Sequence, residues 1–530
     1  MRLSKIAISG LVFLSISGCT KLDQKLQSTI PFTPGSSDVA SLLTGTYNDL
    51  NGLLHGQDQL FSLQETTGDM CLVPTRGGDW DDNGVWRVLH LHAWTVTHGQ
   101  VASVFTGVGK LESDAISTLA FSPNATQRAE ALFLRSLAQF YFLDLYGQVP
   151  YRDVVDYNSI KAAPVLKPVD AVDTIKNTLT AIISQLPAAN RPYLASPDAA
   201  RFLLMKLLLN KGAFINRAAP TFADADMQQV ITLGNQIIAA SPAYSLTPNY
   251  FDNFGPNNAT TSKEAILAWP NNGSANNNGR AAGGINARWM MTLHYNSWDQ
   301  NNNYGNSGWN GFSTVADFYN TFGAGDSRVG NVAYAGVTNV SGLKPGLVRG
   351  QQVNENGVNI TDRQGRPLAF ADSVHNIEID ATKLETAGIR VVKYAPDYAA
   401  YNTGNQKNQL QIFRYSDVLL MIAEAKMRLA TPDVAGALVL INQLRAIRGA
   451  APVAAMPLVN PNNTADPATL LAERGRELYW ESWRREDLIR FGVYLKPWAL
   501  KPIDDPKYLL FPIPPSQLVV NPNLTQNPGY

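Results

Sequence analysis

Cysteine is nearly absent from this sequence, since Cys19 and Cys71 are the only two among 530 residues. At most one intramolecular disulfide could form, and none can form if Cys19 is modified. Cys71 is followed by Leu72 and Val73. We therefore expect it to be a small buried apolar residue rather than a metal ligand or a redox group.

A surplus of charge is lacking as well, because 43 Lys and Arg residues balance 43 Asp and Glu residues. Without residues 1–18, which hold Arg2 and Lys5 and no acidic residue, 41 basic residues face 43 acidic ones. A nucleic-acid-binding protein normally carries a basic surplus, so nucleic acid is not an expected partner. Electrostatic attraction to an acidic lipid surface is not expected either.

The common catalytic and metal-binding motifs are missing. The sequence contains no Walker A pattern, no Gly-x-Ser-x-Gly and no His-Glu-x-x-His. His90 and His92 are spaced to face one side of a strand, with His98 nearby, but zinc requires further ligands at defined geometry. Nothing in the spacing supplies them, so we expect no metal and no cofactor.

A glycosidase requires two carboxyl groups beside the scissile bond, about 5 Å or roughly 6.5–9.5 Å apart. Asp79, Asp81 and Asp82 are the candidates for such a pair. Asp81 and Asp82 are adjacent in sequence, and neither has an apolar surround that would keep an acid protonated. A solvated or turn-forming acidic loop is the favoured interpretation, and we predict no catalytic residue.

A long hydrophobic run is also missing at the N-terminus. Two basic residues precede the apolar run Ile6–Ile16, which is too short to span a membrane and suits a secretory signal. The run closes on Ile-Ser-Gly-Cys, ending at Cys19, and resembles a bacterial lipobox. We expect residues 1–18 to be a lipoprotein signal peptide, Cys19 to carry lipid, and residues 19–37 to be a tether with a reach of roughly 60 Å.

The sequence does contain a series of helices. Apolar residues recur at helical spacing in segments of about 15 to 20 residues, each broken by Pro, Gly or Asn. Short connections between successive helices predict stacked antiparallel helical pairs and a mainly α fold. The predicted segments are Val39–Leu54, Val101–Leu119, Thr126–Tyr146, Pro168–Leu186, Pro197–Asn216, Asp224–Ala240, Tyr415–Leu429 and Pro432–Arg448.

The character of the chain changes from about residue 241 to residue 408. Asn271–Asn310 contains 12 Asn residues and lacks helical periodicity. In Val353–Phe370, two dipeptides ending in Gly are turn signals beside alternating apolar residues, which predicts a small β-hairpin. Because helices return afterwards, we expect a large loop-rich insertion into one domain that spans residues 38–530.

The most highly charged helix is predicted at Asp466–Gly492. Its apolar residues wrap more than one side, which indicates a buried position. Opposite charges lie one turn apart in Glu473 with Arg476, Glu481 with Arg484 and Arg485, and Glu486 with Arg490. Buried charges are tolerated when they are paired, so a structural ion network is favoured over acid–base chemistry.

Several segments occur in an order that matches a known family. They are FRYSDVLLMIAEAKMRL from Phe413, ALVLINQLRAIRG from Ala437, ADPATLLAERGRELYWESWRREDLIRFG from Ala465 and FPIPPSQLVVNPNLTQNPGY from Phe511. Together they resemble the SusD/RagB family of surface lipoproteins. The Tyr-Gly-x-x-Pro turn after Thr126–Tyr146 and the RVVKYAPD segment from Arg390 also resemble that family.

The resemblance implies a tetratricopeptide-like scaffold and a lipid-anchored protein on the outer membrane of a Gram-negative cell, facing the exterior. In the family, such a protein captures a glycan and delivers it to a SusC-like TonB-dependent transporter, with no chemical step. Other members take peptides, and that alternative stays open for this chain. A glycosidase and a purely helical scaffold for other proteins are the alternatives from different classes.

Two loops, Arg76–Trp86 and Arg288–Phe312, combine aromatic rings with amides, small residues and charges. Flat rings stack on the apolar faces of sugars, while Asn, Asp and Arg side chains pair with sugar hydroxyl groups. For Trp94 and Trp289 we expect core packing instead. The predicted ligand-binding residues are Trp80, Trp298 and Trp309 for stacking and Arg76, Asp79 and Asn310 for polar contacts.

Overall fold

The computed structural model describes residues 38–76, 79–188, 192–240, 243–271, 284–297, 308–330, 343–372, 374, 385–398, 400 and 406–530. The predicted lipidation site Cys19, the predicted signal peptide and tether, and Trp298 lie outside the described residues. Helices dominate the described chain, and its strands form only two-stranded sheets. The prediction of a mainly α fold is therefore confirmed.

The long helices of the first half begin where the sequence supplies a cap. Asp38 accepts a hydrogen bond from the Ala40 backbone at 3.0 Å, and Asn124 forms a capping box with Gln127. Gly147 ends a helix at a φ of +67°, which glycine adopts without strain. These helices are α1 (Val39–Leu54), α3 (Gly99–Ala120), α4 (Ala125–Tyr146), α5 (Pro168–Ile182), α6 (Pro197–Ile215) and α7 (Asp224–Ile238).

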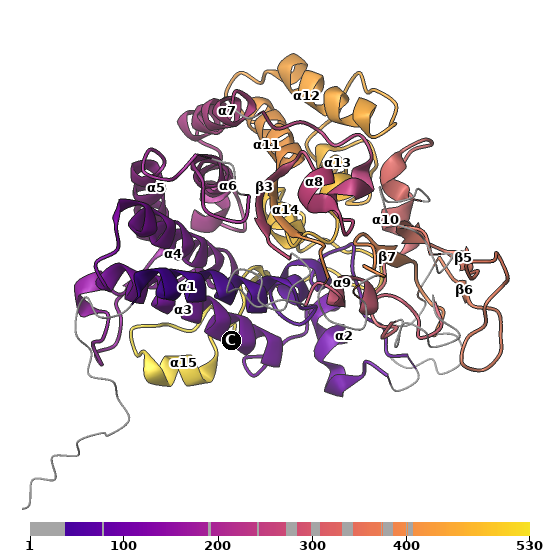
Figure 1. Cartoon of the computed structure of the whole chain (residues 1–530), viewed down its shortest axis with the longest axis horizontal. Coiled ribbons are helices and arrows are strands. Elements are labelled where there is room, and N and C mark those ends of the chain that lie inside the picture. Colours follow the sequence, from indigo (N-terminus) through magenta and orange to yellow (C-terminus); the bar gives the residue numbers. More distant parts are fainter. Residues whose placement is uncertain are drawn as a thin grey trace, which may run out of the picture.

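Successive helices pack side by side into one curved stack (Figure 1). Helix α1 packs on α3, and each of α3 to α6 packs on the next long helix along the chain. Helix α7 then packs against α11 (Tyr415–Met427), which in turn packs against α12 (Val434–Ile447). The stack therefore continues directly from α7 to α11, across a gap of more than 170 residues in the sequence.

Two strands join the ends of the loop-rich segment. Strand β3 (Ala265–Trp269) pairs antiparallel with β8 (Leu410–Arg414), which leads directly into α11. Between them, β4 (Gly346–Val348) pairs with β7 (Arg390–Val392). Among the described residues of this segment, the single-turn helices are α8 (Asn258–Thr261), α9 (Ala287–Met290) and α10 (Ala316–Tyr319).

The predicted β-hairpin at Val353–Phe370 is confirmed. Strands β5 (Gly350–Gln351) and β6 (Ala369–Phe370) pair antiparallel, and isolated bridges extend the pairing toward two turns. Gly357 and Gly365 occupy these turns at φ values of +75° and +76°. Glycine is suited to this left-handed conformation, because it has no Cβ to clash with the backbone.

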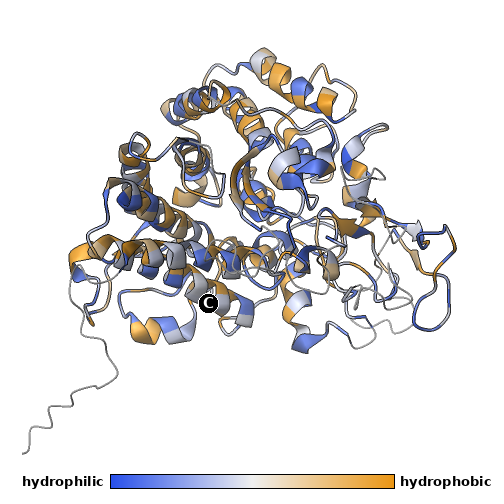
Figure 2. Ribbon diagram, viewed as in Figure 1, coloured by the Kyte–Doolittle hydropathy of each residue, from blue (hydrophilic) through white to orange (hydrophobic). Residues whose placement is uncertain are grey.

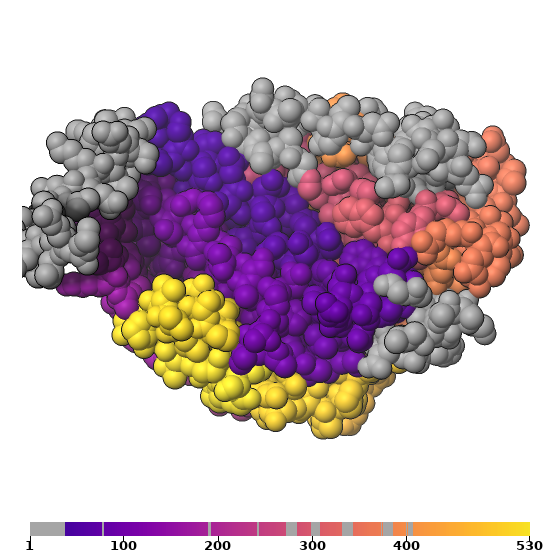
Figure 3. Space-filling model, turned by 90° about the horizontal axis from the view of Figure 1, so that it is seen from below, coloured from indigo at the N-terminus to yellow at the C-terminus, as the bar shows by residue number. Residues whose placement is uncertain are grey.

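The first and last parts of the chain share one face (Figure 3). The Phe511 backbone donates a hydrogen bond to Leu145 at the end of α4, and the Trp94 indole donates to the Tyr530 hydroxyl at 2.7 Å. The remaining short elements are β1 (Val149–Pro150), β2 (Val165–Leu166), α2 (Val85–His90), α13 (Leu470–Leu478), α14 (Arg484–Arg490) and α15 (Pro515–Val520). One buried apolar cluster extends from Leu43 to Leu524. Figure 2 shows that hydrophobic and hydrophilic residues alternate along the helices.

The predicted continuous helix Asp466–Gly492 is wrong, because the structure breaks it into α13 and α14. Trp480 and Ser482 have φ values of +58° and +68°, which no right-handed helix accommodates. The Trp480 ring is 3 % exposed, and its indole donates to Met70 O at 3.1 Å. The Glu65 carboxylate accepts from the backbone nitrogens of Ser482 and Trp483 and so stabilises the break.

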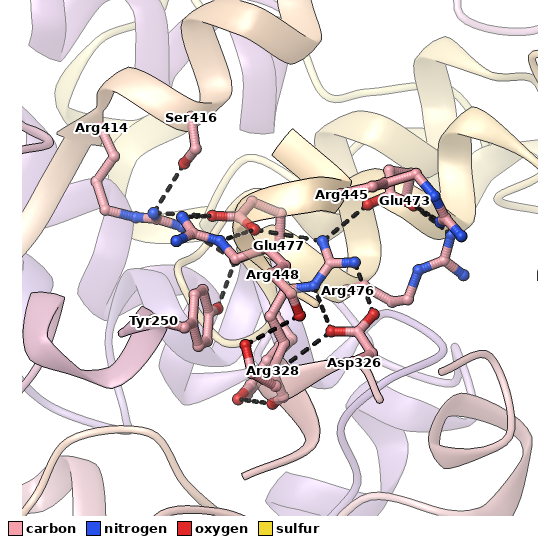
Figure 4. A network of polar contacts seen from close by, with 12 residues as sticks. Tyr250, Asp326, Arg328, Arg414, Ser416, Arg445, Arg448, Glu473, Arg476 and Glu477 are labelled. Atoms are coloured by element: carbon pink, nitrogen blue, oxygen red, sulfur yellow. Dashed lines mark hydrogen bonds and ion pairs between the residues drawn. The ribbon is translucent and has the colours of Figure 1, made fainter. Parts of the chain in front are cut away.

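The interpretation of the charged residues as a structural network is confirmed (Figure 4). The Glu477 carboxylate lies 2.9 Å from an Arg448 nitrogen and 3.1 Å from an Arg414 nitrogen, and Glu473 lies 2.6 Å from Arg476. All of these side chains are buried. Buried ions require such pairing, because burial removes them from water. The predicted pair of Glu486 with Arg490 is also present, at 3.2 Å.

Both predicted ion pairs of Glu481 are absent from that network. Glu481 bonds neither Arg484 nor Arg485; its carboxylate instead accepts from Lys393 at 2.6 Å and from Arg414 at 2.7 Å. Arg484 binds both oxygens of Asp69. The break between α13 and α14 separates Glu481 from the following turn, so spacing along a helix does not decide its partner.

Candidate ligand-binding site

The structure brings the loops around Trp80 and Trp309 into direct contact. The Trp80 indole N–H donates to the Trp309 carbonyl at 2.6 Å, and its ring meets the edges of Trp86 and Phe312. A Cβ at Gly311 would come within 2.5 Å of the Trp80 ring, so only glycine leaves room for it. Both Trp80 and Trp309 are half-buried, and each presents part of its side chain at the surface.

Polar side chains adjoin these rings. The Asp79 carboxylate accepts from the Tyr295 hydroxyl at 2.7 Å and from Arg363 at 2.9 Å. The Arg363 guanidinium also lies 4.1 Å from the centre of the Tyr295 ring and bonds the Glu385 carboxylate at 2.5 Å. Burial lowers the pKa of Arg363, but Glu385 and Asp79 outweigh it and the net pKa is raised. Arg363 therefore stays a cation, and 48 % of its side chain is exposed.

Arg76 and Asn310 lie beneath this surface. The Arg76 guanidinium is buried and donates to the carbonyls of Gly311 and Ala387, each at 2.9 Å. Asn310 donates to Glu385 O at 3.1 Å and accepts from Arg390 at 2.8 Å. Burial lowers the pKa of Arg76 to about 9. In this structure both side chains hold the loop backbones together rather than face solvent.

The neighbouring acidic residues, Asp81 and Asp82, bond side chains from the same part of the chain. Asp81 forms an ion pair with Arg87, and Asp82 accepts from the Trp86 indole at 2.6 Å. Asp82 and Asn83 have φ values of +41° and +54°, which fits a tight turn. Two carboxyl groups with local partners agree with a turn-forming acidic loop.

The histidines expected on a strand lie elsewhere. His90 ends helix α2, and its two ring nitrogens lie 3.1 Å from Cys71 O and 2.9 Å from Ala499 O. His92 lies between Asp504 and Thr67 O. The strand prediction is wrong because Val85–His90 form a helical turn. Among the residues that the structure describes, no group of three His, Cys, Asp or Glu side chains could hold a metal ion.

Sequence reasoning missed two members of the site, Tyr295 and Arg363. Tyr295 lies inside the predicted loop Arg288–Phe312, so its ring could have been included on the same grounds as Trp309. Arg363 follows in the β-hairpin, 284 residues after Asp79 in the sequence. No local pattern connects the two residues. The predicted core positions of Trp94 and Trp289 are confirmed, and Cys71 is buried as predicted.

Across the described segments, no helix is both long enough and apolar enough to cross a membrane.

The stack of helical pairs with its loop-rich segment places this protein in the class of mainly α helical-repeat proteins. The chain belongs to the SusD family, whose sequence model matches residues 257–530.

Relatives cover nearly the whole chain. The starch-binding protein SusD from Bacteroides thetaiotaomicron is 24 % identical, over 91 % of this chain and 88 % of that protein. A SusD superfamily protein from Parabacteroides distasonis superposes with a TM-score of 0.68 and 18 % identity, over 93 % of this chain and 99 % of the other. The surface glycan-binding protein A from B. thetaiotaomicron, solved with laminarihexaose, superposes with a TM-score of 0.64 and 16 % identity, over 92 % and 98 %. The two structural matches establish a shared fold.

Proposed function

We propose that this protein binds an oligo- or polysaccharide at the cell surface and acts without a chemical step. The observation that carries the proposal is the joined surface of Trp80 and Trp309 beside Asp79, Tyr295 and Arg363. Relatives described as starch-binding, or solved with laminarihexaose, support the same ligand class.

The chemistry of this surface suits a sugar. Exposed parts of the Trp80, Trp309 and Tyr295 rings can stack on the apolar face of a pyranose. Asp79 offers carboxylate oxygens and Arg363 offers planar N–H donors for pairs of hydroxyl groups. Trp298 stays a third stacking candidate from the sequence. Arg76 and Asn310 contribute by fixing the loop backbones from below.

We further propose that the protein is anchored to the outer membrane by lipid on Cys19 and faces the exterior. From there it delivers its glycan to a SusC-like TonB-dependent transporter. The lipobox-like sequence before Cys19 and membership of the SusD family support this arrangement.

A glycan array probed with the purified protein tests the binding proposal. Wild type should retain one class of glycan, and a variant carrying Trp80→Ala and Trp309→Ala together should retain none at the same concentration. Retention of the same glycan by the double variant would place binding elsewhere. Capture of peptides but no glycan by wild type would overturn the ligand class.

A further inference from the structure

A cavity of about 270 Å³ lies apart from the Trp80–Trp309 surface. Its walls come from α10, from α13 and the start of α14, and from residues 461–465 and 496–499. None of Asp79, Trp80, Tyr295, Trp309 or Arg363 lines it. The cavity is thus a separate feature of the described structure.

The floor of this cavity is rigid. Arg484 donates two hydrogen bonds to the Asp69 carboxylate, at 2.6 Å from Nε and 2.7 Å from Nη2. Its Nη1 donates to Leu471 O at 2.9 Å. Ala472 and Gly475 face the space with little or no side chain. A Cβ at Gly475 would lie only 3.1 Å from Arg484, so the pair packs directly against the helix backbone. The cavity exists because small residues of α13 stand opposite a fixed ion pair.

One wall is a loop that its own side chains hold in shape. Asn460 donates to Asp466 across the loop at 2.8 Å, and Asn463 accepts from the Ala465 backbone at 3.1 Å. Such Asx contacts fix the backbone without regular secondary structure. A preformed wall lowers the entropic cost of binding a small molecule.

Several polar groups of the lining are unused. The carboxylate of Asp317, the ammonium of Lys496, the amide of Asn462 and the hydroxyl of Thr464 have no hydrogen bond or ion pair with any described residue. The Trp498 indole nitrogen is buried and also has no partner. Thr464 is only 8 % exposed, so its hydroxyl is not simply a surface group. Asp317 and Asn462 are exposed and Lys496 is partly exposed, so these groups are open to a ligand, whereas the buried Thr464 hydroxyl and Trp498 indole nitrogen are costly unless a ligand or water satisfies them.

Asp317 is negative and Lys496 is positive, so a ligand that pairs with both must carry one positive and one negative charge. We propose that the cavity binds a small zwitterion, either a free α-amino acid or a dipeptide. The ligand's ammonium meets Asp317, and its carboxylate meets Lys496 with help from the Trp498 indole N–H. Asn462 and Thr464 provide a donor and acceptors for the groups between the two charges. The volume, just below the usual range for drug-sized ligands, suits a molecule of this size.

Calorimetric titration of the purified protein with alanine and with alanyl-alanine tests this proposal. Tighter binding of one of them identifies the free amino acid or the dipeptide as the better ligand. N-acetyl-alanyl-alanine, which lacks the ammonium, and alanyl-alanine amide, which lacks the carboxylate, should each bind about tenfold more weakly than alanyl-alanine, because each loses a charge-assisted hydrogen bond.

Two variants link each ligand charge to one residue. Asp317→Asn should weaken alanyl-alanine about tenfold and abolish its advantage over the N-acetyl compound, while preserving its advantage over the amide. Lys496→Gln should show the reverse pattern. The matched controls Asp173→Asn and Lys176→Gln, on α5 and outside the lining, should bind like wild type. All four variants should melt like wild type, since the two lining charges have no partners to lose.

The proposal is overturned if neither alanine nor alanyl-alanine binds at millimolar concentration, or if the capped compounds bind equally well. It is also overturned if Asp317→Asn and Lys496→Gln behave like the controls. Binding of a neutral disaccharide that both variants weaken would replace the zwitterion with a sugar. Trp309→Ala should leave dipeptide binding unchanged, so failure of the glycan proposal and failure of this one are separable.

Discussion

Arg448 holds Glu477 by two parallel bonds inside the protein, of 3.1 Å from Nε and 2.9 Å from Nη2. The Glu477→Gln substitution removes a negative charge that Arg414 and Arg448 share and leaves these buried guanidinium groups with fewer carboxylate partners. We expect the free energy of unfolding to fall by about 3–5 kcal/mol, measured by urea denaturation. The control Asp114→Asn breaks an exposed pair with Lys110 and should cost less than about 1 kcal/mol. Equal effects of the two substitutions would contradict the structural role of Glu477.

Acid should unfold this protein through the same network. Burial raises the pKa of Glu473, but Arg328, Arg476 and Arg445 outweigh burial and bring it to about 2, below its ordinary value of 4.5. A lowered folded-state pKa means that the stabilisation is complete above about pH 4.5 and is lost as the pH falls toward 2. The free energy of unfolding, measured between pH 6 and pH 2, should therefore decrease. Glu473→Gln should flatten this decrease, and an unchanged slope would count against the assignment.

The break between α13 and α14 makes a prediction about Ser482. Its φ of +68° is costly for a residue with a Cβ, and no hydrogen bond of its hydroxyl with a described residue compensates. Ser482→Gly should raise the free energy of unfolding by about 0.5–1 kcal/mol, because glycine adopts this conformation freely. Ser482→Ala keeps the Cβ and should stay close to wild type. Destabilisation by glycine and not by alanine would show that the strain is absent.

Trp309→Ala should weaken glycan binding by about tenfold or more, near 1.4 kcal/mol, as expected when a few residues dominate an interface. The melting temperature should change less than in Trp80→Ala, because that substitution also removes the hydrogen bond from the Trp80 indole to Trp309 O. The measurement is calorimetric titration with the glycan that the array returns. Phe121→Ala, at the end of α3, is the control. Wild-type affinity in Trp80→Ala, Trp298→Ala and Trp309→Ala would rule out the stacking surface.

Cys19→Ser should release the protein from the membrane if Cys19 carries the lipid anchor. Fractionation of cells that lack the transporter partner measures membrane association, and in those cells it cannot arise from binding to that partner. Cys71→Ser is the matched control, because Cys71 is buried and cannot serve as an anchor. Membrane association of Cys19→Ser at the wild-type level would exclude the anchor.

Local signals in the sequence predicted much of the helical scaffold. The bounds of α1 agree with the predicted Val39–Leu54, because that segment has regular apolar spacing and Asp38 caps the helix directly before it. The end of α4 at Gly147 follows from the left-handed φ that glycine adopts. Features that depend on distant residues were not predictable. The break at Trp480 requires Glu65, which lies 417 residues away from Ser482 in the sequence.

The same distinction applies to the candidate site. Composition located the two loops, because rings and amides are concentrated in them. Composition did not distinguish residues at the surface from residues that support the loops, and Arg76 and Asn310, which were predicted to make polar contacts with the ligand, are buried. Whether an arginine side chain faces solvent or bonds a carbonyl depends on which segment of the chain packs over it. For Arg76 that segment is at Gly311, which is 235 residues away.

The pairing of β3 with β8 places the two ends of the loop-rich segment next to each other at the edge of the helical stack. A segment closed in this way can change length at little cost, since doubling a flexible loop adds only about 0.6 kcal/mol. Helices α7 and α11 pack directly on each other, so their contact does not depend on what the strands enclose. The contact between α7 and α11 is therefore set without the enclosed segment, and that segment can lengthen or shorten in evolution while the order of the helical stack stays the same.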